Sequence, residues 1–180
     1  GLSYLSLMET RITDQGLKAL SPLGQLQTLY LVNCGVTDDG LRHLASMKGL
    51  VEVMVAKAAI KGDGLLYLSE LPKLEILHLR CCELDDSHFP SSITGFPSLR
   101  DLELDNNHIS NGMLRSLSSL SGLKHLVLSD TDITDEGLEC LVPLADLEYL
   151  ELNNTSITDK GLDTLESLKN LKTLGLKGTA

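Results

Sequence analysis

The sequence is poor in aromatic residues, with four tyrosines, two phenylalanines and no tryptophan in 180 residues. A compact globule of this size normally uses large aromatic side chains to fill its core. Basic residues are also scarce, because 15 Lys and Arg stand against 25 Asp and Glu and leave a formal net charge of −10. Phosphate backbones and anionic membrane surfaces are bound by clustered Lys and Arg. We therefore expect neither a nucleic acid nor a membrane as partner.

Cysteines and long apolar runs are few as well. No apolar run approaches the ~20 residues that cross a bilayer, and no basic-then-apolar leader is present. The four cysteines form no CxxC pair, so they do not suggest a metal site. Cys34 and Cys82 occupy equivalent places two strands apart, about 10 Å at ~4.8 Å per strand, which is beyond disulfide reach. We expect reduced cysteines and no cofactor, and a reducing compartment such as the cytoplasm is favoured.

One pattern of leucines recurs along the whole chain. Its first copy reads Leu2-x-x-Leu5-x-Leu7-x-x-Thr10-x-Ile12, and new copies follow at intervals of 24 residues, with one interval of 25. The copies begin at Leu2, Leu26, Leu50, Leu74, Leu99, Leu123, Leu147 and Leu171. We interpret residues 1–180 as a single domain of seven full repeats and a partial eighth. Solenoids need polar caps at both ends; none is recognisable here, so self-association through uncapped ends is possible.

The spacing within each repeat predicts a strand followed by a short helix. Leu5 and Leu7 alternate with Tyr4 and Ser6, the period expected of a strand with one buried face. Asp14 stands where a helix N-cap belongs, ahead of further leucines. Repeated strands joined by long crossovers run parallel, and these crossovers are almost always right-handed. The prediction is an α/β solenoid with strands on one side and helices on the other.

These motifs resemble the leucine-rich repeat family. The second half of the repeat, Ile-Thr-Asp-x-Gly-Leu, stands at residues 12–17, 133–138 and 157–162, and with valine at 36–41. It is similar to the tail of the cysteine-containing subfamily, which is familiar from F-box ubiquitin-ligase receptors and from plant and bacterial repeat proteins. The resemblance implies a right-handed solenoid with a curved parallel sheet inside and short helices outside. It also implies a surface for binding proteins.

Two repeats depart from the pattern. The third has Ile60-Lys61-Gly62-Asp63-Gly64-Leu65 in place of the Thr-Asp pair, so its helix should begin late. The fourth is one residue longer, with prolines at 90 and 97. Proline disrupts helical hydrogen bonding, and residues 84–97 are therefore predicted to form an irregular outer segment.

The binding surface is predicted from the positions that the repeat leaves free. Side chains at the third, fifth, seventh, eighth and tenth places of a repeat should point to the inner curve. The first repeats place apolar groups there, whereas residues 99–180 carry fourteen Asp or Glu against seven Lys or Arg. The candidate partner-binding residues are Tyr4, Tyr30, Met54, Ile76, His78, Asp101, Glu103, Asp105, His125, Asp130, Asp132, Tyr149 and Glu151.

Two carboxylate–histidine pairs are expected across neighbouring strands, His78 with Glu103 and Asp101 with His125. Such pairs could serve acid–base chemistry or bind a divalent metal. The sequence contains no nucleophile elbow, phosphate loop or HExxH motif, and an open curve does not exclude water. We therefore predict neither an enzyme nor a metal site.

The predicted function is a protein–protein interaction module whose inner face binds a basic or amphipathic partner. One alternative is the substrate-recognition part of an F-box-type ubiquitin ligase. Another is a structural or adhesive spacer whose inner face binds nothing.

Overall fold

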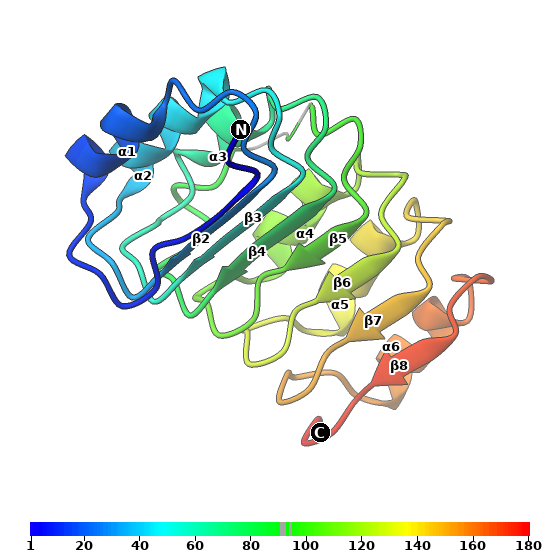
Figure 1. The fold of residues 1–180 in the computed structure, drawn as a ribbon. Coiled ribbons are helices and arrows are strands. Elements are labelled where there is room, and N and C mark those ends of the chain that lie inside the picture. The colour runs from blue at the N-terminus through cyan, green and yellow to red at the C-terminus, as the bar shows by residue number, and fades with distance from the viewer. Residues whose placement is uncertain (91–92, 94) are drawn as a thin grey trace.

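The computed structural model describes residues 1–90, 93 and 95–180. In this part of the chain, eight parallel strands form one sheet in chain order, and short helices lie on one side of this sheet (Figure 1). The strands are β1 Tyr4–Ser6, β2 Thr28–Val32, β3 Glu52–Ala56, β4 Ile76–Arg80, β5 Asp101–Glu103, β6 His125–Val127, β7 Tyr149–Glu151 and β8 Thr173–Gly175. The helices are α1 Asp14–Leu20, α2 Asp38–Leu41, α3 Leu65–Leu68, α4 Asn111–Leu117, α5 Asp135–Leu138 and α6 Asp159–Leu165, with 3-10 segments η1 Arg42–Ser46 and η2 Glu139–Leu141.

The repeat interval sets the register of the sheet. Leu5 pairs with Leu29, and Leu77 pairs with Leu102 across the longer fourth repeat. Alternate strand residues such as Leu126 and Leu150 are completely buried, and they join one continuous aliphatic core with the leucines of the helices. This arrangement confirms the predicted leucine-rich repeat solenoid. We call the helix-free side of the sheet the inner face.

The chain leaves each strand through the same local structure. The eighth residue of each of the seven full repeats has a positive φ, as at Asp130 (57°) and Asn154 (55°), a region that Asn and Asp enter more readily than most residues. At the ninth place of the repeat, the hydroxyls of Thr131 and Thr155 donate to the carbonyls of Leu128 and Leu152 at 2.6 and 2.7 Å. These bonds satisfy carbonyls at the strand end, where the ladder stops.

The prediction that Asp14 caps its own helix is wrong. The cap of α1 is Thr13, and Asp14 is the first helical residue. Its carboxylate instead accepts from the backbone N–H and the hydroxyl of Thr37, both at 2.9 Å, in the next repeat. The stacking of consecutive repeats places these two donors directly against the carboxylate. Asp135 accepts from Thr158 in the same way, at 2.8 and 2.6 Å, so the Thr-Asp pair joins consecutive repeats.

The two irregular repeats behave as predicted where the structure describes them. Helix α3 begins at Leu65, although Gly62 is the residue that aligns with the first residue of α1. Residues 84–97 contain no helix in their described part, and residues 91, 92 and 94 of this segment lie outside it. Phe89, Ile93 and Phe96 are buried and fill the core where a helix would have packed.

Two further observations concern the whole described chain. All four cysteines lie in the described residues and are free, as expected. Among the described helices, none has both the length and the apolar character that a membrane span requires.

Candidate binding surface

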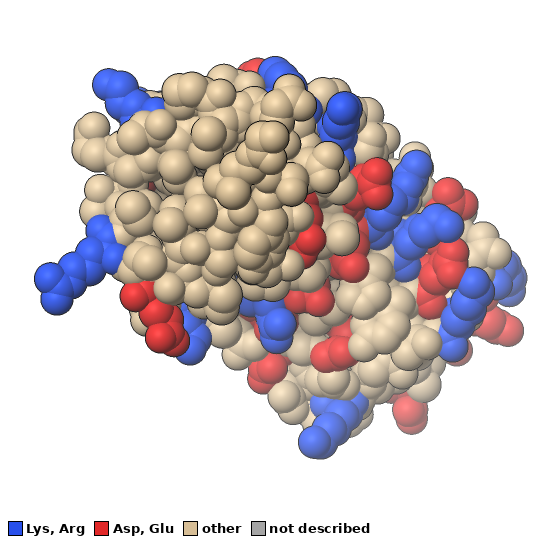
Figure 2. Space-filling model, viewed as in Figure 1, with Lys and Arg blue, Asp and Glu red and all other residues tan. Residues whose placement is uncertain are grey.

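The first strands place mostly uncharged side chains on the inner face. The rings of Tyr4 and Tyr30 meet edge to face, with centroids 5.5 Å apart, and Tyr4 is 53% exposed. Met54 lies beside Tyr30 in the sheet register, and Ile76 lies at the start of β4. The Tyr30 hydroxyl donates to Glu52 at 2.6 Å, which raises the pKa of Tyr30 to about 12. Figure 2 shows a largely uncharged surface over these strands and carboxylates along the middle of the sheet.

The histidine–carboxylate pairs form at the centre of the inner face. The register pairs His78 with Glu103 and Asp101 with His125, as predicted. The carboxylate oxygen Oδ1 of Asp101 lies 3.3 Å from His78 Nε2 and 3.0 Å from His125 Nδ1, so it joins both imidazoles. The other ring nitrogen of His78 is 3.5 Å from Glu103 Oε2. Sequence reasoning found the two pairs but not their linkage through Asp101.

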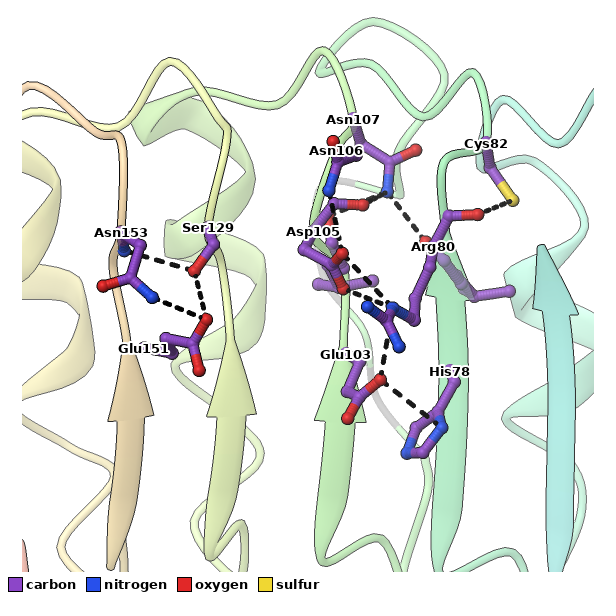
Figure 3. A network of polar contacts seen from close by, with 12 residues as sticks. His78, Arg80, Cys82, Glu103, Asp105, Asn106, Asn107, Ser129, Glu151 and Asn153 are labelled. Atoms are coloured by element: carbon purple, nitrogen blue, oxygen red, sulfur yellow. Dashed lines mark hydrogen bonds and ion pairs between the residues drawn. The ribbon is translucent and has the colours of Figure 1, made fainter. Parts of the chain in front are cut away.

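Arg80 adds a cation that the sequence prediction had not placed beside the acidic residues. Its Nε lies 2.9 Å from Asp105 Oδ1 and 3.5 Å from Glu103 Oε2 (Figure 3). Asp105 also accepts from the side chain of Asn106 at 2.9 Å and is only 3% exposed. Asp105 therefore holds Arg80 in place, and little of its carboxylate can reach a partner.

Glu151 is held by three neutral donors. Its Oε2 accepts from the Tyr149 hydroxyl at 2.6 Å. Its Oε1 accepts from Ser129 and from the Asn153 amide at 2.8 Å each (Figure 3). These hydrogen bonds, that of Tyr149 first, lower the pKa of Glu151. Ser129 and Asn153 were not predicted as site residues. The signal was present, because both occupy the seventh place of their repeats, the place that Arg80 and Asp105 also hold.

The remaining predicted residues lie around this group. The ring of His125 stacks on that of Tyr149 with centroids 4.2 Å apart. Asp130 and Asp132 follow β6 and are exposed, and Asp130 accepts from the side chain of Asn154 at 2.9 Å. The structure thus brings most of the predicted polar residues together over β4–β7, with the apolar ones over β1–β4.

A hollow of about 270 Å³ opens on the inner face between β5, β6 and β7. Its floor includes Val127 and Ser129, which are both buried. Glu103 and Glu151 stand on its two sides, with Tyr149 beside Glu151. The small floor residues leave this space because longer side chains occupy the same row on both neighbouring strands.

A metal ion fits this surface poorly. His78, Asp101 and Glu103 each offer a ligand atom, and these atoms lie within 4.8 Å of one another. Asp101 is however shared by two imidazoles, and Glu103 lies beside the guanidinium of Arg80. A fixed positive charge at this distance opposes a second cation, and we propose no metal site.

The position of His78 predicts a pH-dependent contribution to stability. Burial alone would lower the pKa of His78, but the hydrogen bond with Asp101 and the charges of Glu103 and Asp101 outweigh it, so the pKa is raised. A histidine whose pKa is raised by folding stabilises the folded state. This stabilisation is fully present when the pH is below the unfolded pKa of about 6.5, and it is lost as the pH rises through the folded pKa. Urea unfolding should therefore show a larger stability difference between wild type and His78→Gln at pH 5.5 than at pH 8.5. The same comparison for His43→Gln, in the outer segment η1, should not show it.

The fold and its inner face define a leucine-rich repeat solenoid. The sequence pattern of the leucine-rich repeat family matches residues 2–21, 26–45, 70–87, 122–142 and 145–165, together more than half of the chain. The chain belongs to the leucine-rich repeat family. The match identifies the family in general and does not distinguish its cysteine-containing subfamily. Proteins of this family are generally binding scaffolds rather than enzymes, and most bind other proteins.

Solved structures with the same fold are similar to this chain at low sequence identity. An internalin (inlF) from Listeria monocytogenes is 23% identical, with 97% of this chain and 54% of that chain covered and a TM-score of 0.66. Internalin C2 of the same organism is also 23% identical, with coverages of 97% and 80% and a TM-score of 0.68. TLR13, in a complex with ssRNA13, is 22% identical, with coverages of 99% and 25% and a TM-score of 0.77.

The chain therefore spans about half the length of the first internalin and a quarter of TLR13. At these identities the likeness concerns the fold. No curated protein sequence matches the chain.

Proposed function

We propose that the inner face binds an extended or helical segment of another protein, and that this segment is basic and amphipathic. The observation that carries the proposal is the division of the inner face. Tyr4, Tyr30 and Met54 offer apolar and aromatic contact on β1–β3. Glu151 and Asp130 offer carboxylates near β6 and β7 with no Lys or Arg within ion-pair distance among the described residues. Aromatic and methionine side chains are frequent interface anchors.

The charge of the inner face favours a protein over a nucleic acid. One structure with this fold, TLR13, is in a complex with a single-stranded RNA. The inner face of this chain presents carboxylates over β5–β7, and only Arg80 among the described residues supplies a cation there. Phosphate binding depends on several Lys or Arg side chains, so a basic protein segment is the better electrostatic match.

The alternative functions lack a specific supporting feature. A ubiquitin-ligase receptor would use the same inner face for its substrate but would need an F-box, which residues 1–180 do not contain. A structural spacer would leave the inner face unoccupied, and self-association would use the two ends of the solenoid. The spacer and self-association alternatives predict no loss of binding when carboxylates of the inner face are replaced, whereas a ubiquitin-ligase receptor would lose substrate binding, as the proposed module would.

A peptide-display selection tests the proposal without a known partner. Peptides selected on the wild-type chain should be rich in basic and apolar residues. The double variant Asp130→Asn/Asp132→Asn should bind them about two- to thirtyfold more weakly, since each exposed ion pair contributes roughly 0.2–1 kcal/mol. It should also show a weaker dependence of affinity on salt.

The matched control is Asp146→Asn/Asp163→Asn, which makes the same change in charge at exposed residues away from the inner face. This control should bind the selected peptides like the wild type. Equal weakening by both double variants, or selected peptides without basic residues, would argue against the proposal.

A further inference from the structure

We infer that the hollow between β5, β6 and β7 receives one arginine side chain of the bound segment. This inference rests on the proposed function, because it assigns a particular group of the partner to a particular place on the inner face. Its volume of about 270 Å³ lies just below the ~300–1,000 Å³ of sites for drug-sized ligands. The space therefore suits a single long side chain better than a separate small molecule.

Glu151 supplies a carboxylate that is already fixed for a cation. Donors from Tyr149, Ser129 and Asn153 orient it, keep it ionised and leave its charge uncompensated. Each of these donors is a neutral group, so the negative charge remains available. Binding a cation there costs little side-chain ordering, because the carboxylate is held before the ligand arrives.

Arg80 shows that the other side of the hollow already holds a guanidinium. Its guanidinium lies between Asp105 and Glu103, two carboxylates of one strand and the turn that follows it. The side formed by β6 and β7 has the corresponding carboxylates, Glu151 and the exposed Asp130, and no described Lys or Arg within ion-pair distance. A guanidinium from the bound segment would pair with the carboxylates on this side of the hollow, as Arg80 pairs with those on the other side.

The shape of the hollow favours arginine over lysine. A guanidinium is planar, makes two parallel hydrogen bonds to a carboxylate and packs against aromatic rings, whereas an ammonium is a compact and strongly hydrated charge. The stacked rings of His125 and Tyr149 both line the hollow and supply the aromatic surface. The methyl groups of Val127 on the floor match the aliphatic part of an arginine side chain.

An NMR titration with N-acetyl-L-arginine methylamide tests the inference directly. The signals of Val127, Ser129 and Tyr149 should shift in a saturable way. The uncharged isostere N-acetyl-L-citrulline methylamide should cause little shift, and the lysine analogue should bind more weakly than the arginine one. Glu151→Gln should weaken arginine binding roughly fivefold or more, because a charge-assisted hydrogen bond is lost.

Two further variants control this experiment. Glu148→Gln removes a carboxylate of the same repeat that is paired with Lys124 and Lys172 outside the hollow, and it should leave binding unchanged. Val127→Leu narrows the floor without changing the charge and should weaken binding even if Glu151→Gln alters the local fold. Equal shifts with citrulline, or full binding by both Glu151→Gln and Val127→Leu, would overturn the inference.

The outcome is separable from that of the proposed function, because the titration needs no protein partner. If selected peptides bind through Asp130 and Asp132 while arginine causes no saturable shift, the proposed function stands and this inference falls. If arginine binds in the hollow while no selected peptide depends on the inner face, the hollow is a site for arginine, and the proposed function falls together with the assignment of that arginine to a bound segment.

Discussion

Replacing Leu126 by alanine should lower the free energy of unfolding by about 2–5 kcal/mol, the cost of opening a cavity in a tightly packed core. Leu126 lies in the middle of β6, is completely buried, and pairs with Leu102 and Leu150 on the two neighbouring strands. The surrounding repeats cannot collapse into the space, because the sheet register holds each strand in place. Urea unfolding of the two proteins measures the difference.

Leu162→Ala removes the same atoms from a side chain that is 42% exposed in α6, and it should cost much less. Leu126→Ala should unfold at a lower urea concentration but still in a single transition, because neighbouring repeats share the core. A Leu126→Ala protein as stable as Leu162→Ala would contradict the continuous aliphatic core.

Replacing Gly161 by alanine should also destabilise the protein, by about 0.5–2 kcal/mol after the gain in helix propensity is included. A Cβ at Gly161 would lie 2.5 Å from Asp135 Oδ1 and 2.8 Å from Leu138 Cδ1, both in the preceding repeat. The last place of Thr-Asp-x-Gly therefore requires a glycine, because the carboxylate that joins two repeats lies against it. Thermal or urea unfolding checks the change.

Gly16→Ala provides the matched control, because the three atoms nearest to a Cβ at that glycine all belong to the side chain of Ile12, the first at 2.9 Å, and none is a carboxylate. We expect this variant to lose less stability than Gly161→Ala, because only the side chain of Ile12 has to shift. A double-mutant cycle adds a stricter test: in an Asp135→Ala background, Gly161→Ala should cost less than in the wild type. An unchanged cost would mean that the carboxylate does not impose the glycine.

The fold was predictable because its signal is repeated many times. The alternation of Leu5 and Leu7 recurs in every copy, so the strands, their parallel order and the register of His78 with Glu103 all followed from the spacing. The late start of α3 followed from the missing Thr-Asp pair in the third repeat. Such features depend on the position of a residue within its repeat.

The contacts between repeats were harder to predict, because they depend on which neighbour lies nearer in space. Asp14 had a suitable position for capping its own helix, but the donors of Thr37 in the next repeat lie against its carboxylate. Asp105 was predicted as a contact for a partner, whereas Arg80 from the preceding repeat binds it in a buried position. Both outcomes depend on side-chain reach across the 24-residue interval, which the spacing of apolar residues does not encode.

The structure of the chain bound to a display-selected peptide is the most direct test of the central claim. We predict that the peptide crosses the inner face, with apolar side chains against Tyr30 and Met54 and a basic side chain beside Glu151. A peptide bound across the helices α1 to α6 on the opposite side would contradict the account, whatever its affinity.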